Sequence, residues 1–293
     1  MSKETLLGID LGGTNIKAVW MDDLGNVLRK ETHKTGDALH GSAWKETIRA
    51  LAAEHPSRVG IAAPGLADAD GRKISSMPGR LHGLEGLDWP AFLGRDVSAL
   101  NDAHAALLGE VWCGAARGRR HVVMLTLGTG VGGAVLADGR LLRGATGRAG
   151  HLGHISLDAT GQPDIVGTPG SLEDAVGECT VRERTGFATT RELVEAVRGG
   201  SAKAQQAWGQ AVRALAAGIA SLINAFDPEV LLLGGGITAA GDTLFPLLDE
   251  FLGTMEWRPA GHRVPVIPAQ LGEWAGAIGA ASHTKQEGEK NKS

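Results

Sequence analysis

The residues best suited to chemistry lie in a short segment near the start of the chain, residues 10–17 (DLGGTNIK). Glycines in a turn allow backbone N–H groups to face an anion, and Thr14 adds a hydroxyl. Lys17 adds a positive charge, and Asp10 can hold Mg²⁺ through water. These are the groups that a nucleotide phosphate requires. The predicted phosphate-binding residues are Asp10, Gly12, Gly13, Thr14 and Lys17.

A plain Gly-Gly hairpin is the alternative interpretation of this segment. A Walker A loop or a dinucleotide fingerprint does not fit, because both need a helix directly after the glycines. Here residues 16–20 (IKAVW) have the pattern of a strand.

Two further apolar runs end in glycines, in a chain with 44 glycines among 293 residues. Residues 122–127 lead into Gly128-Thr129-Gly130, and residues 231–233 lead into Gly234-Gly235-Gly236. Each pattern predicts a strand that ends in a tight turn, where the backbone approaches another group closely.

The first and second glycine segments also resemble each other. Leu6–Trp20 aligns with Val122–Leu136, so that Asp10 falls on Thr126 and Ala18-Val19 falls on Ala134-Val135. The alignment predicts a duplicated unit of strand, glycine turn, strand, turn and strand that opens each of two lobes.

The elements between these turns alternate strands with helices, which predicts an α/β fold. Apolar residues spaced by three and four predict helices over 44–54, 102–116, 192–198 and 204–226. The length suits two domains with a cleft between them. We predict a small lobe over 1–117 and a large lobe over 118–282, with the option that the C-terminal helix packs back on the small lobe. Residues 283–293 are charged and polar, and we expect them to be disordered.

The composition is that of a globular protein, with 43% hydrophobic and 21% charged residues. No apolar run approaches the length of a membrane span, and no secretory signal is evident, so we expect a cytoplasmic protein without a membrane partner. Two cysteines do not make a disulfide framework. A net charge of −4 without a basic cluster argues against a nucleic-acid surface.

Three glycine motifs in this order resemble those of the actin-like ATPase and sugar kinase superfamily. Residues 10–17 are similar to its first phosphate motif, residues 125–133 (LTLGTGVGG) to its second, and residues 231–238 (LLLGGGIT) to its adenosine motif. The resemblance implies a two-lobe fold of the ribonuclease H-like type. It also implies ATP as the ligand, and adds four ATP-binding residues: Thr129, Gly130, Gly235 and Gly236.

Within that superfamily the chain is most similar to the ROK family of sugar kinases and repressors. Residues 60–65 (GIAAPG) resemble its glycine-proline loop, residues 100–106 (LNDAHAA) its catalytic segment, and residues 150–154 (GHLGH) its sugar signature. The resemblance runs from about Leu6 to Ala281. It implies MgATP-dependent phosphorylation of a hexose hydroxyl by a glucokinase-like enzyme, commonly a homodimer.

Asp102 lies just before an alanine-rich helical pattern. From spacing alone, capping of that helix is the more natural interpretation. The resemblance instead implies that Asp102 is the general base that receives the proton of the attacking sugar hydroxyl. It also implies sugar contacts by Asn101 and Gly65.

The sugar signature departs from the family in two places. Many ROK kinases have a sugar-binding glutamate where this chain has His151, and many have a zinc loop of cysteines after the position of His154. The resemblance implies that His151, His154 and Glu173 contact sugar, and we expect no structural zinc. A metal held by the two histidines is the alternative, although two histidines without thiolates make a poor zinc site. We expect Pro163 and Pro169 to help hold the loop instead.

Three other functions compete with an ATP-dependent sugar kinase. Only nine residues precede Asp10, so we do not expect the DNA-binding domain of a ROK repressor. Polyphosphate could replace ATP, and a catalytically silent sugar-binding protein would not need Asp10, Lys17 and Asp102. The sequence does not identify the sugar. The basic residues that keep polyphosphate open are Arg117, Arg119, Arg120 and His121.

Overall fold

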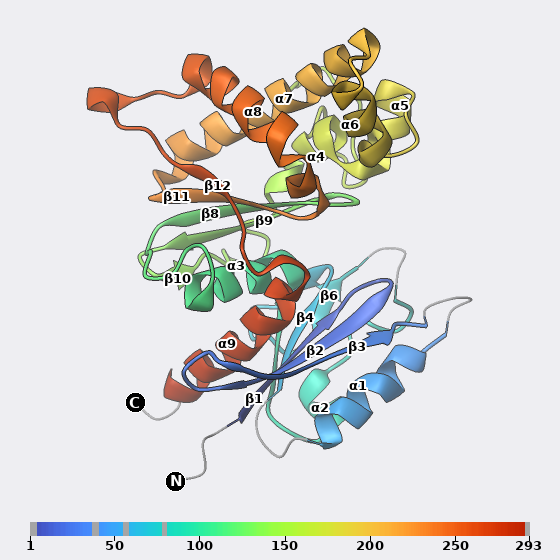
Figure 1. Cartoon of the computed structure of the whole chain (residues 1–293). Helices are drawn as coiled ribbons and strands as arrows, with labels where there is room; N and C mark the ends of the chain where they lie inside the picture. The colour runs from blue at the N-terminus through green and yellow to red at the C-terminus, as the bar shows by residue number, and fades with distance from the viewer. Residues whose placement is uncertain (1–4, 37–40, 55–58, 78–80, 291–293) are drawn as a thin grey trace. The chain divides into compact units, whose positions relative to one another are not determined.

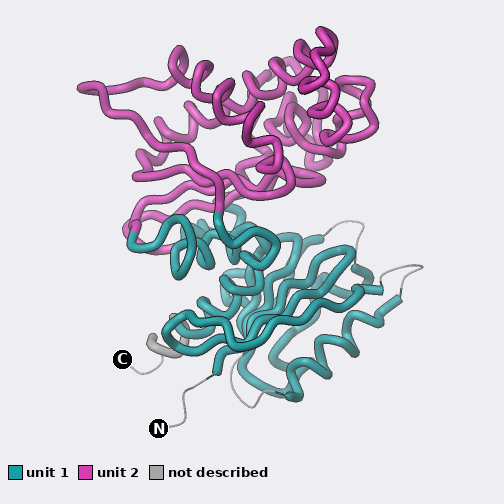
Figure 2. Tube along the Cα trace, in the orientation of Figure 1, with its two compact units in different colours: residues 1–118, 141–149, 270–293 teal, residues 119–140, 150–269 magenta. Residues whose placement is uncertain are grey.

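A computed structural model describes residues 5–36, 41–54, 59–77 and 81–290, with the backbone alone over 286–290. The chain forms two compact units, which Figure 2 shows in teal and magenta. Unit 1 takes residues 1–118, 141–149 and 270–293, and unit 2 takes residues 119–140 and 150–269.

Unit 1 is built on a five-stranded mixed sheet with the strand order β3-β2-β1-β4-β7. β1 pairs antiparallel with β2 and parallel with β4, and β4 pairs parallel with β7. The strands are β1 (Thr5–Leu11), β2 (Asn15–Asp22), β3 (Val27–Lys34), β4 (Val59–Ala63) and β7 (Val97–Asn101), with a separate pair of β5 (Leu66–Ala67) and β6 (Ile74–Ser76).

Helices cover both faces of this sheet (Figure 1). Side chains alternate along β1, so that Leu7 and Ile9 join one buried cluster while Leu6 joins another. The first cluster includes Trp44 and Trp89, from the helices on that face, and the second includes residues of the C-terminal helix. The helices of unit 1 are α1 (Ala43–Ala53), α2 (Trp89–Leu93), α3 (Asp102–Cys113) and α9 (Ala275–Lys290), with a 3₁₀ turn η6 (Gly272–Trp274).

Glycines allow α9 to approach the rest of unit 1 closely. A Cβ on Gly8 of β1 would lie 1.9 Å from the Ala277 carbonyl oxygen. On α9 itself, a Cβ on Gly279 would lie 1.6 Å from the Ala105 carbonyl oxygen of α3. Such distances are impossible for a side chain, so this contact needs glycine.

The predicted disorder of residues 283–293 is wrong for most of that segment. α9 continues to Lys290, and His283 and Thr284 are buried. The charged composition concealed a helix whose earlier turns are anchored by small apolar residues in unit 1. Residues 291–293 lie outside the described part of the chain.

Unit 2 is built on a second five-stranded sheet, with the order β10-β9-β8-β11-β12, and its helices are drawn in Figure 1 in yellow to orange. The strands are β8 (Val122–Leu127), β9 (Val131–Ala137), β10 (Arg140–Leu141), β11 (Val230–Gly234) and β12 (Val266–Pro268). The helices are η2 (Leu152–His154), α4 (Leu172–Val176), η3 (Glu178–Thr180), α5 (Val181–Thr185), α6 (Thr190–Arg198), α7 (Ala202–Phe226), η4 (Gly236–Ala240), α8 (Gly241–Met255) and η5 (Pro259–Gly261).

The predicted duplication is confirmed, because the two sheets have the same order and the same directions. β8 pairs antiparallel with β9 and parallel with β11, as β1 does with β2 and β4. The sequence alignment is one residue out after the turn. Leu11 pairs with Ile16 in unit 1, whereas Leu127 pairs with Val131 in unit 2, so the second turn is one residue shorter.

The α/β class and the four predicted helices are also confirmed; the helices are α1, α3, α6 and α7, each within three residues of its predicted ends. The predicted division at residue 117 falls one residue from the end of the first segment of unit 1. The prediction placed 141–149 in the large lobe and left open that the C-terminal helix packs back on the small lobe. Both segments belong to unit 1, and α9 packs on its sheet. Within the described residues, no helix is both long and apolar enough to cross a membrane.

Candidate active site

The acidic residues of unit 1 meet where its parallel strands end. Asp10 near the end of β1 is in register with Ala62 of β4, and Ala63 is in register with Asn101 at the end of β7. Asp102 follows directly as the first residue of α3. Carboxyl ends of parallel strands are where α/β sheets bind ligands. The structure therefore brings together two carboxylates that lie 92 positions apart in the sequence.

Asn101, and not Asp102, caps α3. Its Oδ1 accepts hydrogen bonds from the backbone N–H groups of Ala103 at 3.0 Å and His104 at 3.2 Å, and its Nδ2 donates to the Gly65 carbonyl at 3.0 Å. Asn101 therefore has the capping role that the alternative interpretation gave to Asp102. Asp102 has an exposed side chain, and its Oδ1 accepts a hydrogen bond from Ala103 N at 2.8 Å.

Two of the predicted sugar contacts, Asn101 and Gly65, therefore form a structural pair behind Asp102. Gly65 has φ +97°, and a Cβ there would lie 2.5 Å from the Ser76 carbonyl oxygen. Only glycine suits this turn. The Gly65 carbonyl in this turn holds the amide of Asn101, and Asn101 caps the start of α3.

The negative charge of Asp102 disfavours the ionised form of Asp10. Burial, and after it the negative charge of Asp102, raise the pKa of Asp10 to about 7, against an opposing effect of Lys17. Desolvation also raises the pKa of Asp102, against hydrogen bonds from Ala103 and Asn101 that lower it. Carboxylates with raised pKa values at a strand end are typical of metal-binding and proton-transfer sites.

The first glycine turn is held from outside by Thr35. Thr35 Oγ1 donates to the Gly12 carbonyl at 2.7 Å, Thr35 N donates to the Thr14 carbonyl at 3.1 Å, and Thr35 is fully buried. Gly13 and Thr14 are exposed at the tip of this turn. The tip is free to meet a ligand, as predicted for a phosphate turn.

Lys17 lies next to Asp10 in the β1–β2 register, but its ammonium has protein partners. Lys17 Nζ is 2.9 Å from Glu273 Oε2 and 3.0 Å from the Glu273 carbonyl oxygen. The hydrogen bond from Lys17 lowers the pKa of Glu273. This ion pair joins residues 256 positions apart, and no local pattern in the sequence indicates it.

The second glycine turn, in unit 2, is fixed by two later segments. Glu178 N and Cys179 N, at η3, donate to the Gly128 and Thr129 carbonyls at 3.1 and 2.8 Å. Glu173 of α4 accepts a hydrogen bond from Val131 N at 2.8 Å. The predicted sugar residue Glu173 and the predicted phosphate motif thus lie in direct contact.

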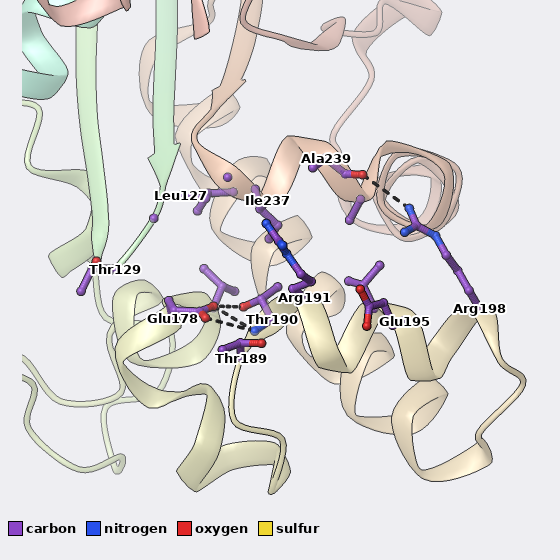
Figure 3. Close-up of a pocket in the computed structure, with 15 residues that line it drawn as sticks. Leu127, Thr129, Glu178, Thr189, Thr190, Arg191, Glu195, Arg198, Ile237 and Ala239 are labelled. Carbon is purple, nitrogen blue, oxygen red and sulfur yellow. Dashed lines mark hydrogen bonds between the residues drawn. The ribbon is translucent and has the colours of Figure 1, made fainter. Parts of the chain in front are cut away.

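A cavity of about 810 Å³ opens beside this turn, within unit 2 (Figure 3). Its walls include Thr129 of the second phosphate motif, Gly236 and Ile237 of the predicted adenosine motif, and one face of α6. Figure 3 shows Arg191 extending from α6 toward Ile237. Cavities of this size take drug-sized ligands. Gly130 and Gly235, also predicted to bind ATP, are not among the lining residues.

Gly235 has a structural task next to the cavity. It has φ +89°, and a Cβ there would lie 2.2 Å from the Leu127 carbonyl oxygen. Glycine is therefore required to bring the end of β11 against the end of β8. Gly130 is similar, because its Cβ would lie 2.3 Å from Glu173 Oε2.

The wall formed by α6 carries charged residues at helical spacing, which sequence analysis missed. Arg191, Glu195 and Arg198 recur at intervals of four and three, and so share a face. Arg198 is engaged, because it pairs with Asp242 and donates to the Ala239 carbonyl at 3.4 Å. Arg191 has no hydrogen bond or ion pair with any residue in the described ranges. The amphipathic pattern identified the helix, but only the fold shows what its polar face meets.

The sugar signature forms η2, packed against α4. Leu172 N donates to the Ile155 carbonyl at 3.0 Å, which sets His154 and Glu173 on adjoining segments. His154 Nδ1 lies 2.8 Å from Asp164 Oδ2. His151 is partly buried just before η2. Asp164 was not predicted, although an acidic residue in a loop that lacks cysteines could have indicated a partner for a histidine.

The two prolines expected to hold the loop after His154 account for only part of its structure. Pro163 and Pro169 do pair, in an isolated bridge. The hydrogen bonds, however, converge on Asp164 between them. Across the described residues, no group of three or more histidine, cysteine, aspartate or glutamate side chains is placed to hold a metal.

The basic residues near position 120 are largely neutralised. Arg119 lies 3.5 Å from a Glu229 carboxylate oxygen, and Arg120 and His121 lie 4.0 and 3.6 Å from Asp138. Hydrogen bonds from the backbone at Arg120 and His121 lower the pKa of Glu229. Glu229 and Asp138 therefore offset part of the positive charge of this cluster.

Fold and motifs together define the class of protein: an α/β protein with the duplicated glycine-turn sheets of actin-like ATPase-fold sugar kinases. Comparison with known proteins gives the family. The ROK family profile matches residues 6–287, and the chain belongs to this family.

Similar proteins cover nearly all of the chain. A glucokinase of Thermotoga maritima is 34% identical, over 98% of this chain and 99% of its own. Among solved structures, a ROK hexokinase from Thermus thermophilus has a TM-score of 0.84 at 31% identity, covering 98% of this chain and 99% of its own. A ROK family glucokinase from Streptomyces griseus, in complex with glucose and AMPPNP, has a TM-score of 0.79 at 28% identity, with coverages of 96% and 99%.

Proposed function

We propose that this protein, a sugar kinase of the ROK family, transfers the γ-phosphoryl group of MgATP to a hexose hydroxyl, with Asp102 as general base. The observation that carries the proposal is the division of tasks at the start of α3. Asn101 satisfies the N–H groups of the helix, so the carboxylate of Asp102, an exposed residue whose carboxyl group is desolvated by the protein around it, is left to receive a proton. A raised pKa makes that carboxylate a stronger base.

Asp10 is proposed to hold Mg²⁺ through water. Its pKa near 7 reflects a carboxylate that lacks sufficient positive charge in its surroundings. A divalent cation would supply that charge, because cations favour the ionised form of a carboxylate. Mg²⁺ bound with phosphates neutralises the charge that develops in phosphoryl transfer.

ATP is proposed to occupy the cavity in unit 2. Thr129 and Gly236 bring the second phosphate motif and the adenosine motif to one cavity, as the resemblance implied for separate parts of a nucleotide. The glucokinase of similar fold was solved with AMPPNP, a nucleotide analogue, which supports this ligand class. We further propose that His151, His154 and Glu173 contact the sugar.

A screen of hexoses tests the proposal. Glucose, N-acetylglucosamine, N-acetylmannosamine and allose are each offered with MgATP, and phosphorylated sugar and ADP are both measured. We expect one or more sugars to be phosphorylated with one ADP per sugar phosphate. Polyphosphate is offered in parallel, and we expect it to be a poorer donor because Arg119 and Arg120 are paired. Turnover with polyphosphate alone would contradict the ATP assignment.

A further inference from the structure

The loop between the sugar signature and α4 is organised around one buried carboxylate. Asp164 has a fully buried side chain, with 0% of its surface exposed. Its Oδ1 accepts hydrogen bonds from the backbone N–H groups of Val166 at 3.0 Å and Thr168 at 2.9 Å. Its Oδ2 lies 2.8 Å from Nδ1 of His154, and Ser171 provides a further side-chain hydrogen bond.

These hydrogen bonds keep Asp164 ionised. Burial alone raises the pKa of this carboxyl, but the hydrogen bonds from His154, Thr168, Val166 and Ser171 together outweigh burial and lower it. A carboxylate has no proton to donate, so each of its partners must be the donor. The hydrogen between His154 and Asp164 is therefore carried by the Nδ1 atom of the ring.

The position of that hydrogen decides what the other ring nitrogen can do. A neutral imidazole carries one hydrogen, so Nε2 of His154 is left as an acceptor. The side chain of His154 is 25% exposed, and Nε2 has no hydrogen-bond partner among the described residues. An accessible acceptor of fixed direction lies next to α4, which carries the carboxylate of Glu173.

We propose that Asp164 is a positioning residue for the sugar site, which holds His154 in the tautomer whose Nε2 accepts a hydrogen bond from a sugar hydroxyl. This role rests on the proposed function. His154 and Glu173 then present two acceptors, and the matching ligand is a sugar that offers hydroxyl donors to both. Because Asp164 acts through His154, it needs no contact with the sugar itself.

The substitution Asp164→Asn should switch His154 to its other tautomer, in which Nε2 carries the hydrogen. The two backbone N–H groups require an acceptor at the Oδ1 position, so the amide oxygen will occupy that position. The amide NH₂ then replaces Oδ2 and faces Nδ1 of His154. Because NH₂ can only donate, Nδ1 must become the acceptor and the hydrogen moves to Nε2. The loop keeps its shape, while the exposed nitrogen changes from acceptor to donor.

Nuclear magnetic resonance of histidine-labelled protein reads the tautomer directly. The ¹⁵N and ¹³C shifts of the ring are recorded without sugar above about pH 8, where an unperturbed histidine is neutral. The signal is assigned by its loss in His154→Gln. We expect the Nδ1–H tautomer in the wild-type protein and the Nε2–H tautomer in Asp164→Asn. The wild-type spectrum alone tests the proposal if the variant fails to fold.

Steady-state kinetics test the consequence for the sugar. In Asp164→Asn the sugar KM should rise about tenfold or more, because the sugar hydroxyl can no longer donate to Nε2 of His154 and must turn to accept from it. The KM for ATP should change by less than about twofold. Asp158→Asn is the matched control: Asp158 lies in the same loop and accepts from Thr160 N and Oγ1, at 2.9 and 2.7 Å, but does not touch His154. The control should leave the sugar KM and the tautomer of His154 unchanged.

Each contrary result has a distinct meaning. A wild-type ring with hydrogen on Nε2 in an active kinase would overturn the role of Asp164 and leave the proposed function intact. If His154 carries its hydrogen on Nε2 in Asp164→Asn and the sugar KM is unchanged, the proposed contact between His154 and sugar is overturned. A wild-type protein that phosphorylates no hexose would contradict the proposed function and, with it, the sugar contact.

Discussion

Asp102, the proposed general base, shows how a neighbouring residue can determine which tasks are left to a side chain. The sequence placed an Asn-Asp pair at the start of a helix but could not say which of the two caps it, because both are good capping residues. The structure gives the cap to Asn101 through two N–H groups and leaves Asp102 as the first helical residue. Local propensity thus predicted the helix, and the assignment of tasks within the pair required coordinates.

Replacement of the proposed base, Asp102, should lower turnover without abolishing sugar binding. In Asp102→Asn, kcat should fall by about 10² to 10⁴, because the amide cannot accept a proton. The sugar Kd should stay within about tenfold, because shape and most hydrogen bonds are preserved. Asp70→Asn, at an exposed position of the same unit, removes an equal charge and should keep full activity. Near-normal turnover in Asp102→Asn would remove Asp102 from the mechanism.

Asp10 should make stability depend on pH. Its carboxyl titrates near pH 7 in the folded protein and near its ordinary value of 3.8 in the unfolded chain. Between these two values the folded protein binds the extra proton, so stability falls as pH rises through that window and is level above it. Without Mg²⁺, Asp10→Asn should therefore be more stable than wild type at pH 8, by at least about 1 kcal/mol.

The comparison is made by denaturant unfolding of both proteins across that range. Near pH 4 both forms carry an uncharged group at position 10, and the difference should nearly vanish. If the variant is more stable than wild type by the same free energy at pH 4 and pH 8, the pKa of Asp10 is not raised in the folded protein. The same variant should lose most of its activity, because an amide holds Mg²⁺ poorly.

At the scale of elements, the glycines of the C-terminal helix determine its packing in unit 1 more than its charged residues do. The sequence analysis treated the tail as disordered because its polar residues show no apolar periodicity. α9 is instead held by close backbone contact with α3, which a pattern of large apolar residues cannot reveal. These close contacts lie in the earlier turns of α9, and the polar segment from residue 283 continues that helix without an apolar pattern of its own.

Substitution at that contact should be costly. A Cβ at Gly279 would lie 1.6 Å from the Ala105 carbonyl oxygen, so Gly279→Ala must push α9 away from α3. We expect a loss of about 1 to 3 kcal/mol in unfolding free energy. Gly209→Ala in α7 is the matched control, since nothing lies within 4 Å of its Cβ position; it should stabilise the helix by up to about 1 kcal/mol. Equal effects of the two substitutions would disprove a tight α3–α9 contact.

α6 should influence nucleotide binding through Arg191. The guanidinium extends toward Ile237 across the cavity, with no protein partner within the described ranges, and can lie over a base or pair with a phosphate (Figure 3). Arg191→Ala should raise the KM for ATP about two- to fivefold, as expected for a partly exposed cation over a ring. Arg182→Ala, on the exposed surface of α5, should not. An unchanged KM for ATP in both variants would remove α6 from the nucleotide site.

At the scale of the whole molecule, the sequence predicted the duplicated sheets but not the contacts between residues far apart in the chain. The duplicated sheets follow from two glycine turns after apolar strands, and the family resemblance fixed their order. The Lys17–Glu273 ion pair and the packing of α9 both join the start of the chain to its end, where one sequence provides no pairing information. At His154 the missing cysteines could be read from the sequence, but the contact with Asp164 could not.

The contact between His154 and Asp164 leads to a prediction for the whole protein. Thiolates are missing between His154 and Glu173, and Asp164 already takes Nδ1 of His154, so the loop should need no zinc. Purified protein should contain far less than one zinc per chain by elemental analysis, and its Tm should not change after dialysis against EDTA. Activity should vanish in EDTA and return with Mg²⁺ alone, because phosphoryl transfer needs that ion. One zinc per chain that survives dialysis, or a Tm lowered by more than about 4 °C, would show that the histidines have found other ligands.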